Sequence, residues 1–195
     1  MMMARRRLAR LITEALAPAN VGSATFLLVA WHRTPTIAEA LRWGLLTILF
    51  AIALPFSFIL WGVRRRRFTD HHIRLREQRP VALVVGIASA LVGLILIGVL
   101  GAPRELIALV VAMEVGLVIS LAITLFWKMS IHVASVAGAI VILVLVFGPR
   151  FVVLAPLIAL VGWARVELSD HTPMQIAVGA VIGTMVAAIV FELLR

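Results

Sequence analysis

Residues 106–127 read LIALVVAMEVGLVISLAITLFW, and the only charged side chain among them is Glu114. A helix of about 20 apolar residues is long enough to cross the ~30 Å hydrocarbon layer of a membrane. Comparable apolar runs recur along the chain, at roughly 17–32, 43–63, 81–101, 106–127, 133–148, 151–164 and 174–194. The sequence therefore predicts an all-α protein, a polytopic membrane helical bundle with six or seven transmembrane helices.

The composition leaves almost no room for a separate soluble domain. Of the 195 residues, 63% are hydrophobic and only 14% are charged, far outside the range of soluble domains. We therefore expect residues 17–195 to form a single transmembrane domain. Only Gly148-Pro149-Arg150 separates the fifth and sixth runs, which predicts a tight hairpin there.

The first 16 residues have the pattern of an amphipathic interfacial helix. Leu8, Leu11, Ile12 and Leu16 fall on one helical face, and the arginines lie elsewhere. The formal net charge of +9 raises the question of a nucleic-acid partner. Because the arginines border the apolar runs, we expect them to contact membrane lipids, and we expect no nucleic-acid partner.

The order of the runs predicts which connections share a side of the membrane. If all seven runs span it, the N-terminus and the connections at 64–79, 128–132 and 165–173 lie together. That side holds 13 of the 18 Lys and Arg residues and four of the five histidines. The positive-inside rule makes it cytoplasmic. The sequence thus predicts a multi-pass protein of the cell membrane whose three basic, histidine-bearing connections face the cytoplasm and could converge on an anion.

The first two of these connections contain the side chains expected to bind such an anion. Polar and basic residues crowd the end of the first connection and the start of the fifth run. In chain order they are His72, Arg74, Arg76, Arg79, Lys128, Ser130 and His132. Lysine and arginine supply charge, serine supplies a hydroxyl, and histidine titrates near neutral pH.

The third connection, Arg165–Gln175, reads RVELSDHTPMQ and ends in a helix start. Thr172 at the N-cap, Pro173 in the first turn and Gln175 three residues after the cap make a capping-box pattern. His171 would then precede a helix N-terminus, where free backbone N–H groups favour a phosphate. Arg165 could bind the same anion through two N–H groups.

The order and spacing of these residues resemble the type 2 phosphatidic acid phosphatase superfamily. Its motifs run Lys-x6-Arg-Pro, then Pro-Ser-Gly-His, then Ser-Arg-x5-His-x3-Asp. Arg79-Pro80 matches the first motif, Ser130 and His132 match the second, and Arg165 and His171 match the third. The resemblance covers about 65–185 and implies a metal-independent phosphatase without cofactors. It implies that His171 attacks phosphorus, that His132 protonates the leaving oxygen, and that Arg79, Arg165 and Ser130 hold the phosphoryl oxygens.

Several positions depart from the family pattern. His72 stands where the first motif has lysine, so Arg74, Arg76 or Lys128 would have to supply that charge. The second motif has Met129 and Ile131 in place of proline and glycine, and the third has Ala164 in place of serine. Gln175 replaces the aspartate that orients the histidine, a role that Asp170 or Glu167 could take by turning inward.

These observations predict a phosphatase that acts on an amphiphilic lipid phosphate or diphosphate, with a polyprenyl or glycerolipid tail, through a phosphohistidine at His171. The expected catalytic residues are His171, His132 and Gln175. A first alternative is a catalytically impaired protein that binds lipid phosphate, because Gln175 is uncharged. A second is a small transporter, for which Glu114 is the support. No Walker loop, dinucleotide turn or His-x-x-x-His metal pair occurs in the sequence, and the oligomeric state stays open.

Overall fold

A computed structural model describes residues 2–195, and within that range the chain is helical with no strand. The N-terminal half contains α1 (Met2–Ala15), α2 (Pro18–Arg33), α3 (Ile37–Ile48), the π-helix η1 (Leu49–Ala53), α4 (Leu54–Arg64), the 3₁₀ turn η2 (Arg76–Gln78) and α5 (Arg79–Val99). The C-terminal half contains α6 (Arg104–Phe126), α7 (Ile131–Phe147), the 3₁₀-helix η3 (Pro149–Leu154), α8 (Pro156–Glu167), α9 (Pro173–Val186), the π-helix η4 (Ala187–Phe191) and α10 (Glu192–Leu194).

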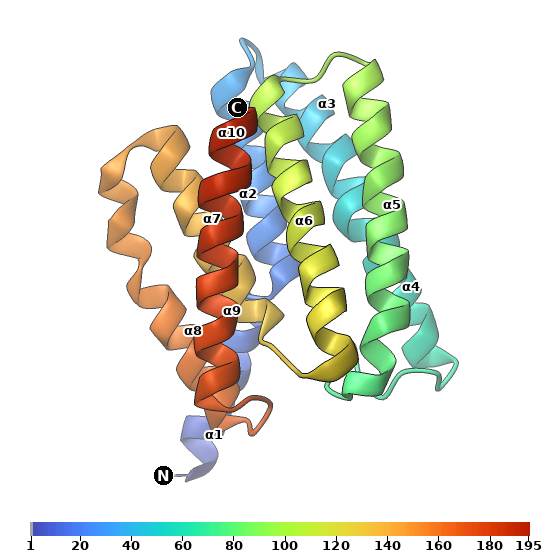
Figure 1. Cartoon of the computed structure of the whole chain (residues 1–195), viewed down its shortest axis with the longest axis vertical. Helices are drawn as coiled ribbons and strands as arrows, with labels where there is room; N and C mark the ends of the chain where they lie inside the picture. Colours follow the sequence, from blue (N-terminus) through green and yellow to red (C-terminus); the bar gives the residue numbers. More distant parts are fainter. Residues whose placement is uncertain (1) are drawn as a thin grey trace.

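These elements make seven segments that run up and down a single bundle (Figure 1). Six helical segments are long and apolar enough to cross a membrane, and α7, with 17 residues, is a shorter apolar helix inside the bundle. The prediction of an all-α, multi-pass membrane bundle with six or seven spans is therefore confirmed. The N-terminus and the connections before η2, before α7 and before α9 lie at one end of the bundle, and the C-terminus lies at the other (Figure 1).

Helix α1 covers part of that end by packing along α8. Ala9 and Thr13 are buried in this contact, and Arg5 Nη2 lies 3.0 Å from Glu167 Oε2. Leu8 and Leu11 stay exposed on its outer face. Residue 1 of the predicted segment 1–16 lies outside the described range. Of the four apolar residues expected on one face, Ile12 and Leu16 pack against the bundle, whereas Leu8 and Leu11 do not.

Two interruptions shape the spans. Pro55 has no backbone N–H to donate to Ala51 four residues before it, and the helix widens to the π-helix η1 just ahead of it. There Phe50 O accepts a 2.6 Å bond from Ser89 Oγ on α5. The second is Gly148, whose φ of +100° ends α7 and reverses the chain into η3, as the hairpin prediction requires.

Glycines on α9 let it pack directly on α7. A Cβ at Gly179 would meet the backbone oxygen of Ser130, and a Cβ at Gly183 would collide with the backbone of Ala134. The G-x-x-x-G pair is therefore a close helix contact of the kind common in membrane bundles. Its consequence is that the starts of α7 and α9, which carry His132 and His171, are held together.

Candidate functional site

His171 lies immediately before α9 and is held by Gln175 of the first helical turn. Thr172 N–H donates to Gln175 Oε1 at 3.2 Å, which identifies that atom as the amide oxygen. The same oxygen lies 3.0 Å from His171 Nδ1, so Nδ1 carries the proton in this contact. Gln175 N–H completes the predicted capping box by donating to Thr172 Oγ1. One glutamine therefore both caps the helix and fixes the histidine tautomer.

That tautomer leaves the other ring nitrogen of His171 with a free lone pair. The side chain is only 6% exposed, and Nε2 is buried with no hydrogen-bond partner. Burial, followed by the positive charges of Lys128, Arg79 and Arg165, lowers the pKa of His171 to about 3. The imidazole is therefore neutral near pH 7, the state in which Nε2 can act as a nucleophile.

Arg165 is the most buried cation of the site. It lies in the last turn of α8, is 1% exposed, and has Nη1 3.1 Å from Asp170 Oδ2, in an ion pair without hydrogen-bond alignment. Asp170 Oδ1 is 3.3 Å from Arg74 Nε on the first connection. The Asp170 carboxylate thus joins two of the predicted phosphate-binding arginines. A buried arginine needs such a partner, because an unpaired charge is strongly destabilising.

Lys128 approaches the same loop from the connection before α7. Its Nζ donates to the backbone oxygen of Asp170 at 2.6 Å. Burial first, and then the guanidinium of Arg79, lowers the pKa of the Lys128 ammonium below its usual value. The structure therefore brings Lys128 and Arg74 to the Arg165–His171 loop, where either could supply the charge that the first-motif position lacks.

The start of α7 is tied to α9 by its backbone. Ser130 N–H donates to Gln175 O at 3.2 Å, and Ser130 Oγ caps α7 by accepting from Val133 N–H. His132 follows in the first turn, buried, with Nε2 lacking a hydrogen-bond partner. Two buried histidines with free Nε2 atoms therefore stand at two adjoining helix starts.

Arg79, the first residue of α5, connects the first two motif segments. Its Nε donates to Ile73 O and its Nη1 to Met129 O, each at 3.0 Å. Arg76 is directed elsewhere, because its Nη1 donates to Leu125 O at the end of α6, at 3.0 Å. The structure thus brings Arg79 into the cluster and places Arg76 on the C-terminal carbonyls of a helix, a favourable position for a cation.

His72, on the first connection, lies beside His132. Its ring centroid lies 5.0 Å from that of His132, and its Nε2 lies 2.9 Å from Glu14 Oε1. His71 contacts the same carboxylate at 3.3 Å. Burial lowers the pKa of His72, although the hydrogen bond to Glu14 opposes the shift.

Glu14 of α1 was not predicted as part of the site. It is the sole acidic residue among the first 38, and this isolation among basic residues could have identified it as a candidate from the sequence. The ligand atoms of Glu14, His71 and His72 lie within 4.8 Å of one another, a spacing that a divalent ion could also use. The Glu14 carboxylate is already contacted by Nε2 of His71 and of His72.

Asp170 and Glu167 do not turn toward His171 in the way that the motif departure suggested. Asp170 pairs with Arg165 and Arg74, and Glu167 pairs with Arg5 of α1. Glu114 lies on α6, buried, with Oε1 lacking a partner, and it makes none of the contacts described above. Orientation of His171 therefore falls to the uncharged Gln175.

Comparison of the chain with known proteins finds no match among protein-family models, curated proteins or solved structures.

Proposed function

We propose that the protein is a membrane-embedded phosphatase that hydrolyses a lipid phosphate or diphosphate through a phosphohistidine at His171. The observation that carries the proposal is the state of this side chain: Nδ1–H is held by Gln175 Oε1, and Nε2 is buried, neutral and free. The resemblance of the motif segments to the type 2 phosphatidic acid phosphatase superfamily supports the same assignment.

The proposed reaction has two steps. His171 Nε2 attacks phosphorus, the bond from phosphorus to the leaving oxygen breaks, and His132 donates a proton to that oxygen. Water then attacks the phosphohistidine and gives a proton to His132, and inorganic phosphate leaves as the lone pair returns to Nε2. His132 must therefore begin protonated; the proton that it gives to the leaving oxygen departs with that group and is replaced by one from the attacking water, so turnover needs only substrate and water.

Cationic side chains would stabilise the charge that develops on the phosphoryl oxygens. Arg165, Arg79 and Lys128 converge beside His171 from three segments, and fixed charges in a site with little water are the main resource for phosphoryl transfer. Asp170 neutralises part of this charge in the absence of ligand. We propose that a bound phosphoryl group accepts hydrogen bonds from Nη1 and Nε of Arg165, in addition to the carboxylate of Asp170.

The substrate we propose is amphiphilic, because the site lies at one end of a bundle of helices that are long and apolar enough to cross a membrane (Figure 1). A polyprenyl or glycerolipid tail would stay in the bilayer while the phosphate reaches the loops. The predicted location of these loops is the cytoplasmic face of the cell membrane. A cysteine introduced beside Ser169 tests it, since the chain contains no other cysteine. Labelling of intact cells by an impermeant maleimide would contradict the cytoplasmic orientation.

A phosphate-release screen with purified protein tests the enzymatic proposal. Polyprenyl and glycerolipid mono- and diphosphates are supplied in EDTA, with and without vanadate. We expect vanadate-sensitive release that His171→Ala abolishes and His32→Ala retains, because His32 packs against Phe147, outside the site. Release that requires a divalent metal would contradict the proposed mechanism.

A second candidate function is lipid-phosphate binding without turnover. It is favoured by Gln175, which brings no negative charge to His171, and by Asp170, which already pairs with Arg165. The same preparation distinguishes the two. Saturable binding of a lipid phosphate without release from any substrate would favour the binding protein and reject the enzyme.

A further inference from the structure

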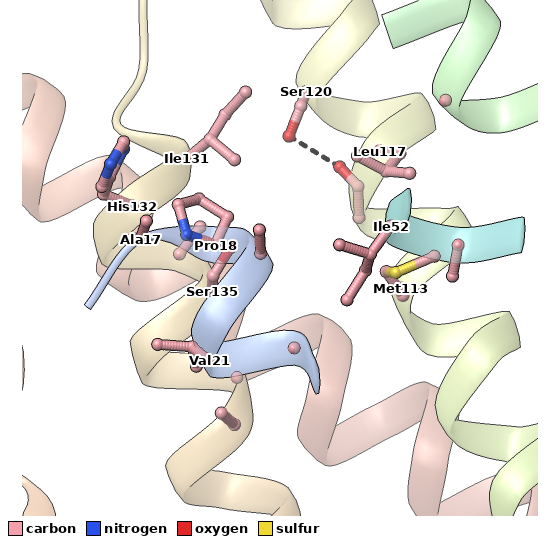
Figure 2. Close-up of a pocket in the computed structure, with 18 of the residues that line it drawn as sticks. Ala17, Pro18, Val21, Ile52, Met113, Leu117, Ser120, Ile131, His132 and Ser135 are labelled. Atoms are coloured by element: carbon pink, nitrogen blue, oxygen red, sulfur yellow. Dashed lines mark hydrogen bonds between the residues drawn. The ribbon is translucent and has the colours of Figure 1, made fainter. Parts of the chain in front are cut away.

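A cavity of about 510 Å³ extends from the candidate site into the middle of the bundle. Its polar end is lined by Glu14, His71, His72, Arg79 and His132, and His171 is not among the lining residues. The rest is lined by apolar residues of several helices, with Ile52, Met113 and Leu117 on one side and Val21 and Ile131 on the other (Figure 2). The cavity thus joins a polar end, which includes Arg79, to an apolar interior.

Two of the hydroxyl groups along the interior, those of Ser120 and Thr25, are satisfied by their own helices. Ser120 Oγ donates to Gly116 O at 2.7 Å, the bond drawn in Figure 2, and Thr25 Oγ1 donates to Val21 O at 2.8 Å. Neither hydroxyl proton is left for a ligand. A wall of this kind suits hydrocarbon and gives no specific site for a sugar or a peptide.

Glycines create much of the empty space. Gly86 on α5 is buried, yet a Cβ built on it meets no atom within 4 Å, because it points into the cavity. Gly116 on α6 also lines the cavity, and its nearest neighbour for such a Cβ is Val186 at 4.0 Å. Larger residues at these positions would fill space that the fold leaves open.

The depth of the cavity corresponds to one leaflet of the bilayer. On α7 the lining runs from His132 at the polar end to Ile142, ten residues that rise about 15 Å at 1.5 Å per residue. Half of a ~30 Å hydrocarbon core is also about 15 Å. A chain that fills a leaflet would therefore fit the cavity lengthwise, with its phosphate at the polar end, near Arg79.

We infer that this cavity binds one hydrocarbon chain of the lipid phosphate substrate and that Gly86 and Gly116 set how far the chain can enter. The inference rests on the proposed function for the identity of the headgroup. It adds that the tail is held inside the bundle instead of against its outer, lipid-facing surface, so that the protein selects substrates by tail length.

Substitution at matched glycines of α5 tests the kinetic consequence. Gly86→Leu fills the cavity, whereas Gly98→Leu adds the same side chain to the same helix at an exposed position where a Cβ also meets nothing. Each methylene that leaves water contributes about fourfold to kcat/KM. We expect Gly86→Leu to lower the kcat/KM ratio of dodecyl phosphate to ethyl phosphate at least tenfold and Gly98→Leu to leave it unchanged.

Photolabelling tests the location of the tail without relying on turnover. Dodecyl phosphate with a terminal diazirine should label Met113 or Ile142 in the wild-type protein, and Gly86→Leu should abolish this labelling. If Gly86→Leu does not fold, Gly116→Leu on α6, which also lines the cavity, replaces it. Labelling confined to exposed residues such as Val84 and Val92 overturns the inference. Correct labelling without phosphate release from any substrate would instead reject the enzymatic proposal and keep the binding site.

Discussion

Replacing Gln175 by methionine removes the one acceptor that orients His171 while keeping a side chain of similar length. In the wild-type protein Gln175 Oε1 accepts from His171 Nδ1 at 3.0 Å and from Thr172 N at 3.2 Å. The variant loses both bonds. Without an acceptor at Nδ1 the imidazole can rotate or carry its proton on Nε2, where it blocks the nucleophilic lone pair.

The expected effect on the rate follows from the strength of one neutral hydrogen bond. Such a bond contributes about 0.5–1.5 kcal/mol net, which corresponds to roughly 2- to 13-fold in rate. In serine proteases, loss of the charged partner of the catalytic histidine reduces turnover by about 10⁴. Because Gln175 is uncharged, we predict that Gln175→Met lowers kcat/KM for lipid phosphate only about fivefold to tenfold.

Two further variants separate orientation from helix capping. Thr172→Ala breaks the other half of the capping box, in which Gln175 N–H donates to Thr172 Oγ1. It should lose about 1 kcal/mol of stability and retain kcat/KM. Gln175→Glu keeps the acceptor and adds a charge, so it should raise the pKa of His171 from about 3 by roughly one unit and retain at least the wild-type rate.

The assay is phosphate release under subsaturating substrate, corrected for the His171→Ala background, with thermal unfolding measured on the same preparations. Wild-type kcat/KM in Gln175→Met would refute an orienting role for Gln175. Equal losses of rate in Thr172→Ala and Gln175→Met would assign the effect to the helix start and not to the histidine.

Three other predictions follow from buried groups of the site. Asp170→Ala leaves Arg165 buried and unpaired, so the free energy of unfolding of this variant in detergent should fall by about 3–5 kcal/mol. Unchanged stability would show that the fold does not depend on the ion pair. Gly183→Ala forces α9 away from α7 and should lower the free energy of unfolding by about 1–3 kcal/mol, whereas Gly98→Ala, at an open helical position, should be neutral or stabilising. Equal unfolding temperatures for the two variants would contradict the close contact of α9 with α7. The folded-state pKa of His171 is lowered to about 3, so the unfolded chain binds a proton at this residue more readily than the folded protein does. Stability should therefore fall as the pH drops from 6.5 towards 3, by up to about 5 kcal/mol. His171→Asn should weaken this pH dependence, and an unchanged dependence of the unfolding free energy on pH would refute the lowered pKa.

Local patterns predicted the features that depend on neighbours within one or two helical turns. The apolar runs located all seven segments, and Thr172-Pro173-Met174-Gln175 located the start of α9 with its capping box. Gly179 and Gly183 marked the helix contact that joins α9 to α7. Each of these signals is set by backbone geometry or by the thickness of the membrane, so spacing alone reveals it.

Contacts between distant segments could not be derived in this way. Glu14 approaches His71 and His72, 57 and 58 residues later in the chain. Arg76 and Arg79 are three residues apart, yet Arg76 binds the end of α6 while Arg79 enters the site. The sequence shows that these charges need partners, but only the packing of α1, α5 and α6 determines which partners they find.

The two roles of Gln175 show what a sequence motif can and cannot predict. The sequence left open whether this residue caps the helix or orients His171. Position 175 lies three residues after the N-cap Thr172 and four residues after His171, so it is within reach of both. In the structure a single oxygen accepts from Thr172 N–H and from His171 Nδ1–H. An oxygen with two lone pairs can serve both donors, and spacing alone could not reveal that.

The most direct test of the account is to identify the atom that carries the phosphoryl group during turnover. The protein is mixed with ³²P-labelled lipid phosphate, quenched in alkali within milliseconds, and digested for mass spectrometry, since phosphohistidine survives base and is lost in acid. We expect a phosphoryl group on Nε2 of His171, because Nδ1 is held by Gln175. A phosphoryl group on His132, on Nδ1 of His171 or on no residue while phosphate is released would contradict it.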